Sequence, residues 1–281
     1  MHLLILGCGD IGTRVGLSLI QQGWRVSAVR RQSHLLPDCF ERLGLDITEE
    51  GRLADLAPLA PDYVLVTPTP LTYDPPGYQA GFADVAASLA SQNWINQCRR
   101  VMWVSSTRVY REANGGWVDE HAPLNRDEPQ AAAMVAAEAS IRRGCTATII
   151  RPAGVYGNPE GMLMRRVIAG EGGSTAATFG NRIHRDDLSR LIVHCLLRDH
   201  SGDSVPPTVV AADHDPTPTH EIEDWLAVQL GLTLRRPAQG GVIRANRRCA
   251  NTLLAQVGFM LTYPTWREGY EAALAALPDS P

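Results

Sequence analysis

Three glycines near the start of the chain, Gly7, Gly9 and Gly12, have the spacing GxGxxG. They follow an apolar run at residues 3–6 and precede a helical pattern at residues 11–22. Gly7 permits a tight turn, Gly9 carries no Cβ that would obstruct phosphates, and Gly12 lets the helix lie close to the strand. Because the amides of a helix N-terminus attract phosphate groups, this arrangement predicts a site for the pyrophosphate of a dinucleotide.

Two arginines follow the next predicted strand, which covers residues 24–29. An acidic side chain at this place would bind the ribose hydroxyls of NAD, whereas Arg30 and Arg31 suit a 2′-phosphate. We therefore expect NADP as the cofactor, with NAD as the alternative. The competing interpretation is that both arginines are solvated surface residues.

The elements that must position these residues alternate between strand and helix. Further strands are predicted at 43–46, 63–66, 101–104, 146–150 and 208–211, and further helices at 49–56, 78–97, 130–143, 162–169, 186–197, 220–230 and 265–276. This alternation predicts an α/β protein with a Rossmann-type doubly wound parallel sheet. We expect the dinucleotide-binding domain at 1–157 and 182–213, and a smaller, largely C-terminal, substrate-facing subdomain at 158–181 and 214–281.

Ligands of such sheets bind at the carboxyl ends of the strands. The residues in the glycine turn and at these strand ends form the expected cofactor site: Gly7, Gly9, Asp10, Ile11, Gly12, Arg30, Arg31, Asp46, Thr67, Pro68, Ser105, Arg151 and Pro152.

Composition limits the kind of partner. The chain has 281 residues and a net charge of −4, which gives no reason to expect nucleic acid. No apolar run approaches the roughly 18 residues of a membrane span, and the N-terminus does not resemble a signal peptide. We therefore expect a cytoplasmic protein with no membrane partner. The six cysteines are dispersed and form no zinc-binding pattern, so no metal site is predicted.

Basic residues bear on the substrate. A set of arginines in the later chain indicates an anionic small molecule, although a solvated charged face explains the set equally well: Arg165, Arg166, Arg244, Arg247 and Arg248. A homodimer is a further expectation.

Four segments resemble, in order, those of the extended short-chain dehydrogenase/reductase family, the NAD(P)-dependent epimerase/dehydratase group. Residues 104–110 (VSSTRVY) resemble its SS-x-x-VYG segment, and residues 150–157 (IRPAGVYG) its RP-x-x-VYG segment. Residues 183–188 (IHRDDL) resemble its IH-x-x-DL segment, and residues 258–269 its GF-x-YP-x-x-EG ending. Within this family the chain most resembles the bacterial YeeZ-like proteins.

The resemblance implies a catalytic trio of Ser or Thr, Tyr and Lys, of which only the serine is matched, by Ser106. The Tyr-x-x-x-Lys motif falls on Gln130 and Met134. All 26 residues counted as Lys or Arg are arginines, so the motif occurs nowhere in the chain. Arginine does not replace this lysine simply, because a guanidinium does not release a proton.

Two classes of function remain open. We favour an NAD(P)-dependent oxidoreductase or epimerase/dehydratase that acts on a small carbonyl, alcohol or nucleotide-sugar-like substrate with a degenerate Tyr-Lys pair. Ser106 would orient the substrate, and Tyr110 is the preferred acid among Tyr73, Tyr110, His121 and Tyr156. A tyrosine at an apolar strand end is, however, often a core residue. The alternative is a non-catalytic NADP(H)-binding sensor or scaffold.

Overall fold

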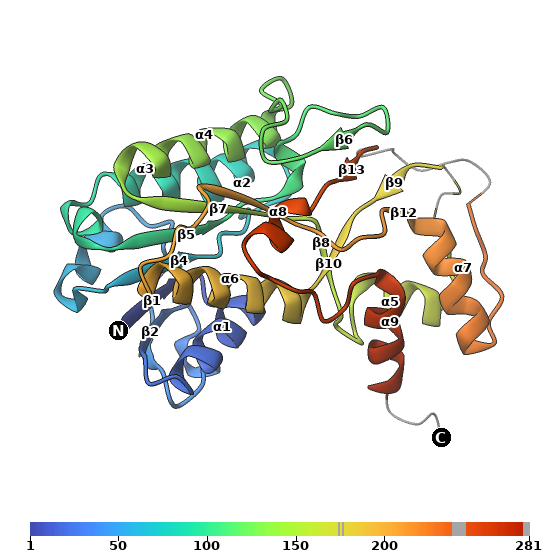
Figure 1. Cartoon of the computed structure of the whole chain (residues 1–281), viewed down its shortest axis with the longest axis horizontal. Coiled ribbons are helices and arrows are strands. Elements are labelled where there is room, and N and C mark those ends of the chain that lie inside the picture. The colour runs from blue at the N-terminus through green and yellow to red at the C-terminus, as the bar shows by residue number, and fades with distance from the viewer. Residues whose placement is uncertain (174, 176, 238–245, 278–281) are drawn as a thin grey trace. The chain divides into compact units, whose positions relative to one another are not determined.

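The structure of the chain is a computed structural model that describes residues 1–173, 175, 177–237 and 246–277 (Figure 1). It divides into two compact units. Unit 1 comprises Met1–Arg111, Leu124–Arg151 and Ser189–Val209, and unit 2 comprises Glu112–Pro123, Pro152–Leu188 and Val210–Pro281. The expected functional division differs from these units at 112–123, 152–157, 182–188 and 210–213, and it stays a prediction.

A seven-stranded sheet forms the centre of unit 1. In sheet order its strands are β11 (Thr208–Ala211), β7 (Ala147–Pro152), β5 (Arg100–Val104), β4 (Tyr63–Val66), β1 (His2–Leu6), β2 (Arg25–Val29) and β3 (Glu41–Leu43). The pairs β1–β2, β1–β4, β2–β3, β4–β5 and β5–β7 are parallel. The strand order reverses beside β1, which confirms the predicted doubly wound α/β fold.

Burial explains the central strands. All five residues of β1 and all four residues of β4 are buried, as expected for strands with helices on both faces. Figure 1 shows α2, α3 and α4 on one face of the sheet and α1 and α6 on the other. The helices of unit 1 are α1 (Asp10–Ile20), α2 (Pro75–Tyr78), α3 (Val85–Ala90), α4 (Pro129–Gly144) and most of α6 (Arg185–His200).

Two predicted elements of unit 1 are wrong in their bounds. The third strand covers Glu41–Leu43 rather than 43–46, because it is a short edge strand with little burial to mark its pattern. The single helix predicted at 78–97 is divided into α2, a π-helical segment Gln79–Asp84, α3 and a 3-10 segment Asn93–Gln97. Gly77 and Gly81 pack against the loop at 69–72 so closely that a Cβ at either position would collide with backbone oxygens.

The remaining deviations are small. The segment predicted as a helix at 49–56 is a 3-10 helix at Arg52–Leu59 that contains Pro58. A proline in this position removes a backbone donor, which favours short 3-10 turns over a regular α-helix.

Unit 2 is built from short strand pairs and helices. Its strands are β6 (Trp117–Val118), β8 (Gly154–Tyr156), β9 (Phe179–Gly180), β10 (Arg182–His184), β12 (Thr217–Pro218) and β13 (Arg248–Cys249). Its helices are α5 (Met162–Ile168), α7 (Thr219–Leu230), α8 (Thr252–Gln256) and α9 (Trp266–Ala275). Three helices, α5, α7 and α9, contribute to one buried apolar cluster of this unit around Tyr156 and Trp266.

Candidate functional site

The turn after β1 has the local geometry that the glycine spacing predicts. Gly7 has a φ of +75°, in the left-handed region that favours glycine. Its carbonyl accepts a 2.6 Å hydrogen bond from Thr67 Oγ1, and Cys8 N donates to Val29 O at 2.9 Å. These bonds fix the turn to the two strands that flank β1. Helix α1 then begins at Asp10, so its first amides lie at the carboxyl edge of the sheet.

The three glycines have different neighbours. A Cβ on Gly7 would lie 2.9 Å from Thr67 O, and a Cβ on Gly12 would lie 2.9 Å from Ile5 Cγ2. Glycine is therefore required by the protein itself at these two positions. At Gly9, the residue before α1, nothing in the described chain lies within 4 Å of an added Cβ. The backbone therefore leaves open space at the helix N-terminus where a larger side chain would fit.

The end of β2 presents the two predicted arginines. Arg31 Nη1 lies 3.8 Å from Asp46 Oδ2, and Arg31 is largely exposed. Arg30 is half-buried, and among the residues that the structure describes no carboxylate pairs with it. Burial raises the pKa of Asp46, but hydrogen bonds from Thr48 N and Oγ1 and the Arg31 charge outweigh burial and lower this pKa. The carboxylate is thereby kept ionised beside Arg31.

Two adjacent serines follow β5 and have different partners. Ser105 is buried, and its Oγ donates to Glu138 Oε1 at 2.6 Å. Ser106 is half-buried, and its Oγ accepts a 3.1 Å hydrogen bond from Arg108 N. Within the described residues no acceptor is recorded for the Ser106 hydroxyl proton. Ser106 is therefore a competent donor to a carbonyl oxygen.

A buried ion pair holds the end of β7 against α4. Arg151 donates to Glu138 through Nε at 3.1 Å and through Nη2 at 2.7 Å, and both side chains are almost fully buried. Arg151 Nη1 also donates to Tyr110 Oη at 3.1 Å, while the guanidinium lies over the Tyr110 ring. The side chains of Ser105 and Arg151, both predicted to bind the cofactor, contact this network. Pro152, which ends β7, is buried as well.

Tyr110, the preferred acid, has none of its surface exposed. Its contacts with Arg151 are those of a core tyrosine, so its catalytic role stays a prediction without support from its surroundings. Tyr73, in contrast, is 89% exposed, and His121 is exposed in a turn. Tyr156 is buried in unit 2, where its hydroxyl donates to Thr265 O, and burial raises the pKa of this hydroxyl far above its ordinary value.

The first turns of α4 carry Gln130 and Met134, on which the Tyr-x-x-x-Lys motif is expected to fall. Gln130 is half-buried and Met134 is 2% exposed. Glu128 caps this helix by accepting from Ala131 N at 2.9 Å, and it also binds Arg108 through both carboxylate oxygens. Sequence reasoning missed this pair. An acidic residue immediately before a proline at the first helical position is a recognisable start signal that could have indicated it.

Unit 2 contains a second buried acid of a different kind. Asp213 is 2% exposed, and its Oδ1 accepts from Asp215 N at 3.2 Å. Its Oδ2 has no hydrogen-bond partner in the described part of the chain. The guanidinium of Arg182, whose backbone carbonyl accepts from Asp213 N, donates instead to the carbonyls of Gly180 and Thr217.

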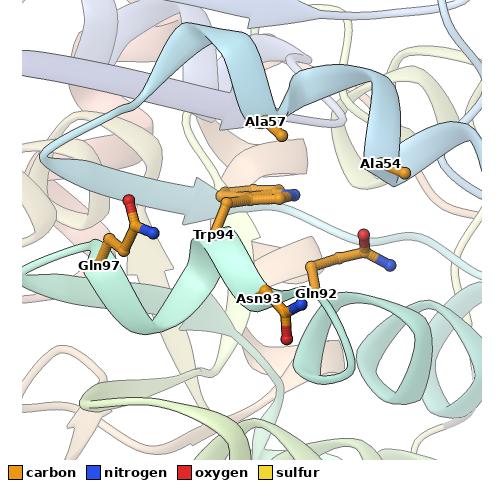
Figure 2. A pocket seen from close by; sticks show the side chains of 6 residues that line it. All are labelled: Ala54, Ala57, Gln92, Asn93, Trp94 and Gln97. Atoms are coloured by element: carbon orange, nitrogen blue, oxygen red, sulfur yellow. The ribbon is translucent and has the colours of Figure 1, made fainter.

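Unit 1 also has a pocket that none of the predicted site residues line. It has a volume of about 380 Å³ and is bordered by the 3-10 segments Arg52–Leu59 and Asn93–Gln97, and Figure 2 shows the Trp94 ring between them. Both segments lead into the amino ends of their strands, β4 and β5. Trp94 Nε1 donates to Leu53 O, which fixes the ring. This pocket therefore belongs to the edge of the sheet opposite the glycine turn.

Other kinds of site receive no support. The described residues contain no group of three or more His, Cys, Asp or Glu side chains arranged to hold a metal ion. In the same part of the chain, the helices are too short or too polar to cross a membrane. Of the basic set, Arg166 pairs with Glu223, Arg247 is buried and Arg165 is exposed. Arg244 lies outside the described residues.

Comparison with known proteins gives similarity at the level of structure. No family model and no curated protein matches the chain. A solved protein from Methylobacillus flagellatus, provisionally named an NAD-dependent epimerase/dehydratase, is 28% identical, with a TM-score of 0.78 over 98% of both chains. A functionally unknown conserved protein from Silicibacter pomeroyi is 23% identical, with a TM-score of 0.70 over 98% of both chains.

A third structure is the enzyme WbmG from Bordetella bronchiseptica in complex with NAD and UDP. It is 14% identical, with a TM-score of 0.80 over 98% of this chain and 92% of that one. The doubly wound sheet, the glycine turn and these similarities define an α/β protein of the dinucleotide-binding class. Similarity of structure to these proteins supports the resemblance to the extended short-chain dehydrogenase/reductase family that the sequence motifs indicate. Its likeness to the YeeZ-like proteins within that family stays a prediction.

Proposed function

We propose that the chain is an NADP(H)-dependent oxidoreductase or epimerase/dehydratase-like enzyme that works without a Tyr-x-x-x-Lys pair. Its substrate is a small carbonyl, alcohol or nucleotide-sugar-like compound. The observation that carries the proposal is the open space at Gly9, directly before the N-terminus of α1. A glycine that its own fold does not require is explained when a ligand must approach the backbone there.

The residues of the turn fit a dinucleotide. The amides at the start of α1 would hold the pyrophosphate, and Gly7 and Thr67 would keep the turn in place. Arg30, which lacks a described carboxylate partner, and Arg31 would bind a 2′-phosphate. The same fold holds NAD in the WbmG structure. A bound nicotinamide would supply or accept the hydride, and the chain would supply the orientation of the substrate.

Ser106 is the residue that we assign to substrate orientation. Its oxygen accepts from Arg108 N, which leaves the hydroxyl proton for a carbonyl oxygen of the substrate. Arg108 is itself fixed by Glu128 and lies over the Tyr78 ring, so the loop that carries Ser106 is held from two sides. Such a preorganised donor stabilises negative charge on a reacting oxygen.

One observation favours a second function, a non-catalytic NADP(H)-binding sensor. The resemblance assigns the acid and the lysine to the positions of Gln130 and Met134, and Met134 is buried as an apolar residue. A glutamine amide does not transfer a proton near neutral pH, and positioned proton transfer contributes roughly 10²–10⁴ in rate. The sensor would bind the dinucleotide at the glycine turn and would not catalyse a reaction.

Calorimetry tests the binding half of the proposal. Titration of the wild-type chain with NADPH and with NADH is expected to give saturable binding of NADPH. A folded protein that binds neither nucleotide would contradict both functions.

Turnover separates the two functions. NADPH oxidation is measured against aldehydes, ketones and nucleotide sugars for the wild type, Ser106→Ala, and the double variant Gln130→Tyr with Met134→Lys. An enzyme is expected to show wild-type turnover that falls on the order of 100-fold in Ser106→Ala. Ser140→Ala, on the far part of α4, is the matched control and should leave the rate unchanged. Turnover that appears only in the double variant would establish the sensor.

A further inference from the structure

Arg248 of unit 2 is held between two aromatic rings. The centre of its guanidinium lies 5.0 Å from the Trp117 ring centroid and 4.8 Å from the Phe179 ring centroid. Its Nε donates to Gly115 O at 2.9 Å. Strands β6 and β13 pair directly, with Trp117 in register with Arg248. The orientation of this guanidinium is therefore set by the backbone and by both rings.

Its terminal amino groups are not used by the described protein. A guanidinium has five N–H donors, and for Arg248 only the Nε bond to Gly115 is recorded within the described residues. Glu112 lies in the loop that contains Gly115, but its Oε1 accepts from the amides of Asn114 and Gly116. The undescribed stretch 238–245 has the sequence AQGGVIRA and contains no acidic residue. Among the described residues Arg248 therefore has no carboxylate partner, unlike an arginine in a structural ion pair.

Arg267 offers a contrast within the same unit. Its guanidinium lies 4.1 Å from the Trp266 ring centroid, so it too is stacked on a tryptophan. Its Nη1, however, lies 3.1 Å from Asp215 Oδ2, which completes an ion pair. A stacked arginine can therefore still use its donors in an ion pair. Arg248 is stacked without a carboxylate partner in the part of the chain that the structure describes.

Trp117 supports the same conclusion. It is 57% exposed and lies in a strand of two residues. A large aromatic side chain that is this accessible contributes little to a core. A ring at the surface that orients an arginine is typical of a recognition site, because the stacked guanidinium loses little freedom when it binds a planar oxyanion.

We propose that Arg248, clamped by Trp117 and Phe179, is an oxyanion-binding site of unit 2 that takes a phosphate or carboxylate group of a small-molecule ligand in a bidentate manner. The site lies in unit 2 and uses no residue of the glycine turn, so it does not depend on dinucleotide binding. Bidentate recognition requires the planar fork of arginine, which the point charge of lysine does not reproduce.

The test uses the full chain with the Gly9→Val substitution, so that the glycine turn does not contribute anion binding. Isothermal titration with pyrophosphate, and separately with succinate, at constant ionic strength is compared for this parent, for Arg248→Gln, for Arg248→Lys and for Arg267→Gln. Thermal unfolding of each variant shows that it is folded. Comparison of the two anions distinguishes a phosphate from a carboxylate ligand.

We expect saturable binding of one of the two anions by the parent, at least tenfold weaker binding in Arg248→Gln, and a change below twofold in Arg267→Gln. Arg248→Lys should also bind more weakly than the parent. Parent binding that is absent, or equally weakened by both glutamine variants, would overturn the proposal. Undiminished binding by Arg248→Lys would overturn the bidentate geometry.

Discussion

The turn after β1 and the first turns of α4 are the two places where the resemblance implies cofactor binding and proton transfer, and the residues found at the two places differ in what the fold requires of them. At the turn, Gly9 leaves space that the fold does not need. At α4, Gln130 and the buried Met134 stand where a tyrosine and a lysine are expected. Helix α4 is nevertheless held by ion pairs of Glu138 with Arg151 and of Glu128 with Arg108.

Helix α4 is held in unit 1 by ion pairs that do not involve Gln130 or Met134. The contacts of α4 with β7 and with Arg108 involve Glu138 and Glu128, which are separate from the positions of the missing pair. The ion pairs of this helix therefore use other residues than the two on which the Tyr-x-x-x-Lys motif is expected to fall. At α1, by contrast, Gly12 lets the helix pack closely on β1, whereas no described contact requires a glycine at position 9.

The largest effect is expected for Glu138→Ala. Its removal leaves Arg151 buried without its carboxylate, which costs about 3–5 kcal/mol in the free energy of unfolding. Urea denaturation measures the loss. A double variant with Met at positions 138 and 151 should lose less, because no charge remains unpaired. If the single variant were as stable as the wild type, the position of α4 in the fold would not depend on this ion pair.

Gly9→Val is expected to weaken NADPH binding at least 100-fold, or about 2.7 kcal/mol, because its side chain occupies the space before α1. Stability should change by less than about 1 kcal/mol, since that space is open. Gly16→Ala on the same helix is the matched control, because its Cβ would lie 2.5 Å from Phe40 Cζ.

That control should show the opposite pattern. Overpacking at Gly16 is expected to lower the free energy of unfolding by about 1–3 kcal/mol while the folded protein keeps its affinity for NADPH. Calorimetry and urea denaturation of both variants give the two comparisons. An unchanged affinity in Gly9→Val would show that the open space holds no ligand.

The smallest of these effects concerns cofactor choice. Replacing both Arg30 and Arg31 with Ala should remove about a tenfold preference for NADPH over NADH and leave NADH affinity unaltered. Arg30→Ala alone should reduce this preference more than Arg31→Ala alone, because Arg31 already lies near Asp46. Arg52→Ala, an exposed arginine paired with Asp55, is the control. Equal wild-type affinity for both nucleotides would identify the two arginines as solvated surface residues.

The fold could be predicted where hydrophobic pattern and burial agree. The strand at Tyr63–Val66 and the strand at Thr208–Ala211 have the predicted bounds because each is an apolar run buried on both faces. The edge strand β3 was shifted because its residues are partly exposed. The helix predicted at 78–97 was wrong because alanine-rich composition does not reveal the close contact of Gly77 and Gly81 with the loop at 69–72.

The candidate site was predictable in position but not in the direction of its side chains. Strand-end topology placed Ser105, Ser106 and Arg151 at the same edge of the sheet, but the side chains of adjacent residues in extended backbone point in opposite directions. Only the structure distinguishes Ser105, whose hydroxyl donates to Glu138, from Ser106, whose oxygen accepts from Arg108 N. The aromatic clamp of Arg248 joins three segments far apart in sequence, so no local spacing could indicate it.

Asp213 Oδ2, which is buried without a hydrogen-bond partner among the described residues, makes the stability of the fold depend on proton uptake. Burial, with the charges of Asp215 and Glu268, raises the pKa of this carboxyl from 3.8 to about 7. Between these two values the folded chain holds a proton that the unfolded chain releases, so the free energy of unfolding falls as pH rises and levels off above pH 7. From pH 6 to pH 8 this single group should account for about 1 kcal/mol. Asp213→Asn, which keeps the shape of the protonated acid, should remove that part of the pH dependence in urea titrations, and an unchanged slope would show that the buried oxygen is not the proton acceptor.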